Sequence, residues 1–366
     1  MEGNEQILLV VIMKIKIAIL DKEQTYLSRV MNSLEGKFSD KLEIYCFTDA
    51  EKALNTVVQS NIDVFFASYV YEIETHRIPE RCGFAYLVDT KDVDKYNGER
   101  AVCKFQKLES FYGDIVDIFT DKNDVMLSGS SINADVPLFL FTSASGGAGA
   151  SVVAAAFAMN MAREGKKTIY LNLENFGDSG FYFHGDGQYD LRDMMIALKS
   201  GKSNIAMKME TIAKKDKSGV YFIETPQNAL DVGMLTTEDV NELVELFRKS
   251  GVFDCVVIDM NFAIGEKEIS LFKQAYSIVF VSDASETSNG KLYRAYETLV
   301  VAEQKANASF LGRLSVFYNK VNGKSASGID IPGISVIGAA PKFEKVNAEN
   351  IARKIAELGV FQELLK

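Results

Sequence analysis

The chain has 366 residues, of which 40 are basic and 50 acidic, so its formal net charge is −10 at pH 7. This length favours two domains of about 100 to 200 residues each. The negative charge argues against a protein that coats nucleic acid through its overall field, and we expect no specific nucleic-acid partner. The four cysteines show no C-x-x-C spacing, so a structural zinc site is not expected.

The N-terminal segment is too short and too polar to cross a membrane. Its apolar run, residues 7–13, is interrupted by Lys14 and Lys16, well before the roughly 20 apolar residues that a spanning helix needs. No small-residue cleavage site follows this run. We therefore expect a cytoplasmic protein in which residues 1–12 are a dispensable extension.

Short apolar runs recur along the N-terminal third and are separated by stretches long enough for helices. Strands that alternate with helical crossovers favour a parallel, doubly wound sheet of the flavodoxin-like kind. In such sheets ligand and switch residues lie at the carboxyl ends of the strands. The predicted strands are residues 14–20, 42–47, 63–67, 84–88 and 101–105.

Acidic and hydroxyl side chains follow the first and third of these strands. Asp21 and Glu23 come after the first strand, and Ser68 comes after the third. Residues 14–120 resemble the receiver domain of two-component response regulators, in which an acidic pair holds Mg²⁺ and an aspartate closing strand three accepts phosphate. The resemblance implies a receiver-like domain over residues 1–120.

Several positions depart from the receiver pattern. Ser68 stands where the family has its phosphate acceptor, and Lys22 interrupts the acidic pair. Thr90 and Lys107 stand near the positions of the family's hydroxyl and lysine. A serine cannot form the acyl phosphate of the usual switch, so we expect an unphosphorylated protein-interaction module. The alternative is an unrelated flavodoxin-like domain, which would also be an unphosphorylated module.

Residues 121–135 separate the two predicted domains. They are rich in small and polar residues and show little periodicity, which is typical of a linker. Residues 136–366 are predicted to form a second α/β domain around a doubly wound parallel sheet. Its strands are expected at residues 137–141, 168–173, 220–223, 253–260, 277–281 and 313–318.

A glycine-rich loop opens the second domain. Residues 142–151 read T-S-A-S-G-G-A-G-A-S and lie between a predicted strand and a predicted helix. Backbone N–H groups in such a loop, with the positive end of the helix dipole, are suited to hold phosphate oxygens. The residues expected to bind the cofactor through this loop are Gly146, Gly147, Ala148, Gly149, Ala150, Ser151 and Val152.

A carboxylate at the end of a later strand completes the expected metal site. Residues 253–260 are mostly apolar and run into Asp259, the shape of a Walker B strand. Such an aspartate usually binds Mg²⁺ directly or through water, and the serine or threonine that closes the loop supplies a hydroxyl. Ser151 and Asp259 are therefore the predicted magnesium ligands.

Together these elements resemble the deviant Walker ATPases of the MinD and ParA group, whose loop reads x-K-G-G-x-G-K-[ST]. The glycines and the closing serine match, whereas Ser145 replaces the signature lysine and Ala150 the ordinary phosphate-loop lysine. The resemblance implies roles for three further residues. Glu174 matches the aspartate credited with positioning the attacking water, Asn319 the asparagine that recognises adenine, and Pro341 a proline beside the base.

A degenerate receiver domain fused to such an ATPase is most similar to the TadZ/CpaE family, ParA-related proteins of tight-adherence pilus assembly. Residues 172–178, N-L-E-N-F-G-D, are similar to that family's D-L-D-x-x-F-G-D stretch. The resemblance implies a homodimer across the nucleotide. It also implies recruitment of pilus or secretion assembly proteins at one cellular site, often a pole.

The two missing lysines bear directly on the expected activity. Loss of one electrostatic donor typically lowers the rate of group transfer by roughly 10² to 10³. We therefore expect ATP and Mg²⁺ as cofactors, very slow hydrolysis, and dimerisation that depends on ATP; Lys320 and Lys324 are candidates to lend the missing charge. Two alternatives remain open: an actively cycling positioning ATPase of the MinD/ParA type, and an interaction protein with no nucleotide.

The last predicted helix bears on membrane binding, because MinD relatives bind membranes through a basic amphipathic C-terminal helix. Ile351, Ile355 and Leu358 share one face, but acidic residues balance the basic ones and Gly359 interrupts the run. We therefore expect this helix to pack against the core, with membrane association at most indirect.

Overall fold

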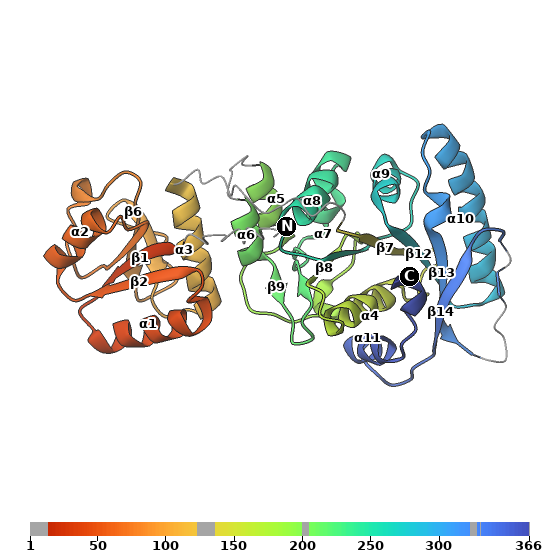
Figure 1. Cartoon of the computed structure of the whole chain (residues 1–366), viewed down its shortest axis with the longest axis horizontal. Coiled ribbons are helices and arrows are strands. Elements are labelled where there is room, and N and C mark those ends of the chain that lie inside the picture. Colours follow the sequence, from red (N-terminus) through yellow and green to blue (C-terminus); the bar gives the residue numbers. More distant parts are fainter. Residues whose placement is uncertain (1–13, 123–135, 200–204, 323–327, 330, 366) are drawn as a thin grey trace, which may run out of the picture. The chain divides into compact units, whose positions relative to one another are not determined.

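The computed structural model describes residues 14–122, 136–199, 205–322, 328–329 and 331–365. The chain divides into two compact units: residues 1–129 with 201–211, and residues 130–200 with 212–366. Each unit is built on its own β-sheet (Figure 1). The predicted extension at residues 1–12 and nearly all of the predicted linker lie outside the described residues.

The first unit contains a six-stranded sheet in the order β2-β1-β3-β4-β6-β5. Apart from the antiparallel β5, this is the flavodoxin-like order. The predicted receiver-like sheet is therefore confirmed. Its strands are β1 (Ile15–Leu20), β2 (Leu42–Phe47), β3 (Val64–Ser68), β4 (Gly83–Val88), β5 (Lys95–Tyr96) and β6 (Glu99–Cys103).

Helices cover both faces of this sheet. Side chains of a strand point alternately to opposite faces, so β1 contributes to two cores. Ile17 packs with α1 (Gln24–Phe38) and α3 (Leu108–Lys122) on one face. Ala18 packs with α2 (Ala50–Gln59) on the other.

Two connections differ from the expected helical crossovers. Between β3 and β4, where every residue is described, the chain forms only a short 3₁₀ helix, η1 (Thr75–Arg77), and β4 connects to β6 through β5. The β5–β6 hairpin turns at Asn97 and Gly98, both with left-handed backbone (φ 50° and 84°). A two-residue hairpin turn requires this conformation, and the Asn-Gly dipeptide supplies it. That local turn signal explains why a hairpin replaces a helix here.

The second unit is built on an eight-stranded sheet in the order β14-β13-β12-β7-β11-β8-β10-β9. Its neighbouring strands are parallel except for β9 with β10, which confirms the predicted doubly wound sheet. The strands β9 and β14 were not predicted. The strands are β7 (Leu138–Thr142), β8 (Thr168–Asn172), β9 (Lys214–Lys215), β10 (Tyr221–Phe222), β11 (Cys255–Asp259), β12 (Ser277–Ser282), β13 (Leu314–Val321) and β14 (Ser335–Pro341).

Helices also cover both faces of this sheet (Figure 1). One face carries α4 and α11, while α8, α9 and α10 contact β11, β7 and β12 from the other. The helices of the second unit are α4 (Ala150–Arg163), α5 (Leu191–Lys199), α7 (Ala229–Gly233), α8 (Thr237–Lys249), α9 (Glu266–Gln274), α10 (Glu286–Lys305) and α11 (Ala348–Glu357), with 3₁₀ helices η2 (Ser179–Phe181), η3 (Leu311–Arg313) and η4 (Gln362–Leu365). Helix α6 (Ile205–Ile212) falls, except for its last residue, among the residues grouped with the first unit.

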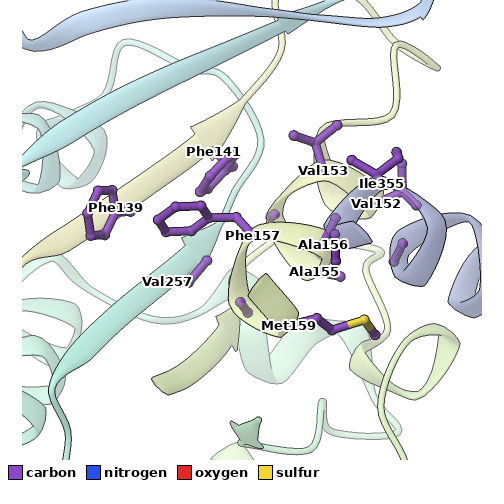
Figure 2. Packing of buried hydrophobic residues seen from close by; sticks show 14 of the residues in the cluster. Phe139, Phe141, Val152, Val153, Ala155, Ala156, Phe157, Met159, Val257 and Ile355 are labelled. Carbon is purple, nitrogen blue, oxygen red and sulfur yellow. The ribbon is translucent and has the colours of Figure 1, made fainter. Parts of the chain in front are cut away.

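Helix α4 lies at the centre of the larger core. The ring of Phe157 has its centroid 4.6 Å from that of Phe139 and 5.3 Å from that of Phe141, both on β7 (Figure 2). Opposite the sheet, Asn160 Nδ2 and Arg163 Nη2 donate to the carbonyl of Ala356, at 3.3 and 2.9 Å. These bonds satisfy a carbonyl in the last turn of α11, which has no intrahelical partner there. They hold the C-terminal end of α4 against α11.

The C-terminal helix α11 packs against α4, as predicted. Ile355 is fully buried and Ile351 packs against the same cluster, whereas Leu358 is 47 % exposed beyond the end of the helix. Within the described part of the chain, no helix is both long and apolar enough to span a membrane.

The substitution Gly83→Ala is expected to destabilise the first unit. A Cβ at this position would lie 2.3 Å from Ile118 Cγ2 and 2.9 Å from the Ile118 carbonyl oxygen, and overpacking of this kind typically costs about 1–3 kcal/mol. Urea unfolding of the full chain measures the change. Gly36→Ala in α1 is the matched control, because a Cβ there meets nothing within 4 Å and alanine stabilises a helix by about 0.5–1 kcal/mol over glycine. Equal losses in both variants would contradict the tight contact.

Candidate functional site

The glycine loop joins β7 to α4 in the predicted order of strand, loop and helix. Gly147 and Gly149 have left-handed backbone (φ 78° and 91°), which glycine adopts at no steric cost. Gly149 is also the N-cap of α4. The first N–H groups of a helix have no intrahelical partner and carry partial positive charge. The loop therefore has the backbone form of an anion site.

Ser143 ties the base of the loop to the neighbouring strand. Its Oγ lies 2.7 Å from the carbonyl oxygen of Val281 on β12 and 2.9 Å from that of Ser145. It also accepts a hydrogen bond from the Ser145 N–H at 3.1 Å. The sequence analysis assigned no role to Ser143. Its position as a small polar residue directly after the predicted strand was the one feature that could have indicated this role.

The side chains that replace the two lysines contribute no charge to the loop. Ser145 Oγ is buried and has no hydrogen-bond partner among the described residues. Ala150 is 8 % exposed and belongs to the hydrophobic cluster around α4. Both positions therefore face the protein interior.

Three oxygen-bearing side chains meet beside the loop. Ser151 Oγ, in the first turn of α4, donates to Glu174 Oε2 at 2.9 Å. Asp259 is fully buried at the end of β11, and its Oδ2 accepts from Tyr170 Oη at 3.0 Å and from Asn172 Nδ2 at 3.1 Å. The structure thus brings together the two predicted metal ligands and the predicted catalytic residue.

Burial raises the pKa of Asp259 well above its ordinary value, and the negative charge of Glu174 raises it further. The hydrogen bond from Tyr170 lowers the pKa but does not offset this rise. Asp259 Oδ1 is buried without a hydrogen-bond partner among the described residues. An orphaned carboxylate oxygen beside a second carboxylate and a hydroxyl fits the all-oxygen donor set that Mg²⁺ prefers.

Asn172 organises the loop that follows β8. Its Nδ2 donates to Asp259, and its Oδ1 accepts from the Glu174 N–H at 3.0 Å. A Cβ on Gly177 would lie 2.2 Å from Asn172 Oδ1, so the loop packs directly on this amide. In the sequence, Asn172 was only the first residue of the stretch N-L-E-N-F-G-D. In the structure it holds the Asp259 carboxylate and the backbone of Glu174.

The two predicted adenine-binding residues lie on the last two strands. Asn319 is 1 % exposed, and its Nδ2 donates to the carbonyl oxygen of Ala148 at 2.9 Å. Pro341 is exposed at the end of the edge strand β14, where it pairs with Val321. Asn319 therefore supports the phosphate loop directly. The roles of both residues in adenine recognition stay predictions.

In the first sheet a buried ion pair occupies the carboxyl ends of the strands. Lys104, directly after β6, has its Nζ 3.1 Å from Asp21 Oδ2 and 3.2 Å from Asp89 Oδ1. The Asp21 side chain is fully buried and that of Lys104 is 5 % exposed. Burial alone would lower the pKa of Lys104, but hydrogen bonds to Asp21 and Asp89 raise it above its usual value.

This arrangement corrects the expected position of the receiver-like lysine. Lys104 reaches the acidic residues, whereas Lys107 had been matched to that place. The cause is the end of β6 at Cys103, two residues before the predicted end of the strand. Ser68 Oγ, at the phosphate-acceptor position, is buried with no hydrogen-bond partner among the described residues.

The chain was compared with known protein families and solved structures. Residues 13–120 match a family described as "TadZ-like, receiver domain". No curated protein matches the chain. Among solved structures, a ParA family ATPase from Chlorobium tepidum TLS is 17 % identical with a TM-score of 0.48, covering 61 % of this chain and 99 % of its own.

Two MinD structures are also similar. The MinC:MinD cell division protein complex of Aquifex aeolicus is 19 % identical with a TM-score of 0.42, covering 60 % of this chain and 86 % of that one. The septum site-determining protein MinD of Pyrococcus horikoshii OT3, complexed with Mg-ADP, is 13 % identical with a TM-score of 0.43, covering 60 % and 94 %.

The substitution Asp259→Asn is expected to stabilise the nucleotide-free protein increasingly as the pH rises. Because the folded-state pKa lies above the ordinary value of 3.8, the folded protein binds this proton more tightly. The free energy of unfolding therefore falls as the pH rises between the two pKa values. Asparagine can still accept hydrogen bonds from Tyr170 and Asn172 and removes this loss.

Thermal unfolding from pH 4 to pH 8, without nucleotide or metal, measures this effect of Asp259→Asn. The advantage of the variant in Tm should grow with pH, whereas Asp92→Asn, at an exposed position, should show no such trend. A pH-independent difference would contradict a buried, ionisable Asp259.

The substitution Lys104→Met is expected to destabilise the first unit by about 3–5 kcal/mol, because it leaves the buried Asp21 carboxylate without its cation. Lys91→Met, at an exposed position in the loop after β4, is the charge-matched control and should change stability by less than about 0.5 kcal/mol. Urea unfolding of the full chain distinguishes the two. If Lys104→Met unfolds like the control, the ion pair does not hold Asp21.

Proposed function

Taking residues 13–120 as a TadZ-like receiver domain, we propose that the chain is an ATP-binding, dimerising scaffold of tight-adherence pilus assembly with very slow ATP hydrolysis. Residues 1–120 form its receiver-like domain, 121–135 its linker and 136–366 its nucleotide-binding domain. The observation that carries the proposal is the cluster of Ser151, Glu174 and Asp259 beside a glycine loop with the backbone of an anion site.

The loop backbone from Gly146 to Val152 would hold the phosphates of ATP. Ser151 and Asp259 would hold Mg²⁺, which neutralises charge on the phosphate oxygens when bound. A cation at this position would also relieve the repulsion between Asp259 and Glu174 that raises the Asp259 pKa. Asn319 and Pro341 remain the candidates for contact with the base.

Hydrolysis is proposed to be very slow because the loop offers no cation to the transferring phosphoryl group. Ser145 and Ala150 both face the interior. Glu174, the candidate for positioning the attacking water, is hydrogen-bonded to Ser151. Stabilisation of charge on the transferring group provides much of the catalysis in phosphoryl transfer. The absence of both lysines therefore reduces the rate of hydrolysis strongly.

Dimerisation is proposed to take place across the nucleotide. Phe176 is 91 % exposed and Phe181 60 % exposed, and both follow Glu174 in the segment after β8. Large apolar side chains exposed beside a ligand site are typical of a surface that another protein covers. The partner that this proposal assigns is a second copy of the chain, bound when the loop holds ATP.

The receiver-like domain is proposed to bind pilus or secretion assembly proteins without being phosphorylated. Ser68 stands at the acceptor position and offers no carboxylate for an acyl phosphate. Through these partners the cytoplasmic protein would be concentrated at an assembly site such as a cell pole, and any membrane association would be indirect.

Calorimetric titration of the full chain with ATP and Mg²⁺ tests the proposal. We expect saturable binding at submillimolar ATP that weakens in Asp259→Asn. Phosphate release should be slower than about 0.1 s⁻¹, from a typical enzyme rate of about 10 s⁻¹ reduced by at least 10². An absence of binding at millimolar ATP with Mg²⁺ would rule the proposal out.

The two alternatives predict different results. Strong stimulation of phosphate release by DNA or lipid vesicles would favour an actively cycling positioning ATPase. Gel filtration with and without ATP addresses the nucleotide-free interaction protein, which would elute as an unchanged monomer. The proposed scaffold should shift to a dimer with ATP, and Phe176→Ser should weaken this shift without weakening ATP binding.

A further inference from the structure

Lys320 lies against the glycine loop although it belongs to a distant strand. It follows Asn319 near the end of β13, and its Nζ lies 2.6 Å from the carbonyl oxygen of Gly147. Residues 143–151 themselves contain no basic side chain. Lys320 therefore brings an ammonium group to a loop that has none of its own. Lys324, the other candidate cation, lies outside the described residues.

The backbone around Lys320 is irregular in a way that favours this placement. Lys320 has a φ of +59°, a left-handed conformation that typically costs a residue with a side chain about 1–3 kcal/mol. The pairing of β13 with β14 shifts register between Tyr318 and Val321, around the same residue. The surrounding structure thus holds Lys320 in a strained backbone conformation next to the loop.

Asn319 fixes the distance between β13 and the loop. Its buried amide donates to the Ala148 carbonyl at 2.9 Å. A Cβ on Gly149 would lie 2.4 Å from Asn319 Nδ2, so the loop and the strand are in direct contact. Consecutive residues of β13 therefore bond consecutive carbonyls of the loop, at Ala148 and Gly147.

The ammonium group keeps its capacity to bind anions in this position. A lysine Nζ has three N–H donors, of which the Gly147 carbonyl uses one. The side chain is exposed, so its flexible stem can turn the remaining donors toward a ligand on the loop. Hydrogen bonds from Ser285 hold the pKa of Asp283 low, and the positive charge of Lys320 lowers it further. Lys320 thus stands near the carboxyl ends of both β7 and β12.

We propose that Lys320 is the phosphate-binding cation of this site, contacting the outer phosphates of a nucleoside triphosphate in place of both absent loop lysines. The inference rests on the proposed function, because it requires nucleotide on the glycine loop. Lys320 would supply positive charge for binding of the nucleotide. It is not part of the loop, whereas the two lysines that it replaces would be.

Substitution of Lys320 in the full chain separates this role from a purely structural tie to Gly147. Lys320→Gln keeps a polar donor but removes the charge, whereas Lys320→Arg keeps the charge. Lys305→Gln, at an exposed position in the last turn of α10, is the charge-matched control. Each variant is titrated calorimetrically with ATP, ADP and AMP in the presence of Mg²⁺, after its Tm has been compared with that of the unchanged chain.

The expected result is graded by phosphate number. Lys320→Gln should weaken ATP binding about 10- to 100-fold, the usual effect of losing a hydrogen bond to a charged group, with a smaller effect on ADP and none on AMP. Lys320→Arg and Lys305→Gln should bind ATP like the unchanged chain. Equal ATP affinity of Lys320→Gln and the unchanged chain, or an equal loss for all three nucleotides, overturns the assignment of Lys320 alone. An unchanged chain that binds no nucleotide overturns the proposed function together with it.

Discussion

The candidate site depends on the packing of one alanine-rich helix. Its alanine side chains are buried in the larger core, and Phe157 packs against Phe139 and Phe141 on the sheet. Polar bonds from Asn160 and Arg163 to Ala356 hold the opposite side of the helix against α11. The glycine loop precedes this helix, and the side chains of Ser143, Asn319 and Lys320 hold its backbone. With the loop held in this way, its backbone N–H groups are available to an anion.

Both sheets carry a buried aspartate at the carboxyl ends of their strands, but the surroundings of the two carboxylates differ. Parallel α/β sheets gather polar side chains at the carboxyl ends of their strands. In the first sheet the Asp21 carboxylate meets Lys104, and its charge is neutralised within the protein. In the second sheet Asp259 lies beside Glu174, and its Oδ1 has no hydrogen-bond partner among the described residues. The first site contains its own cation, whereas the second has the composition of a site that needs one.

Much of this architecture could be predicted from the sequence, because buried parallel strands are nearly continuous apolar runs. The same logic placed Ser151, Glu174 and Asp259 at the ends of neighbouring elements. Two wrong predictions in the first unit have local causes. The Asn97-Gly98 turn forms a hairpin where a helical crossover was expected. Strand β6 ends two residues earlier than predicted, so Lys104 and not Lys107 contacts the acidic residues. Lys320 was named from the sequence as a candidate for the missing charge, but its contact with Gly147 joins residues far apart in the chain, so no local pattern could reveal that contact.

The buried pair of Lys104 and Asp21 has a consequence for how the chain can receive information. The Asp21 carboxylate is fully buried and held by Lys104, and Ser68 offers no carboxylate at the phosphate-acceptor position. Without an acceptor carboxylate, the charge at this end of the sheet cannot change through formation of an acyl phosphate. A conditional signal would therefore have to enter the molecule through another part of the chain.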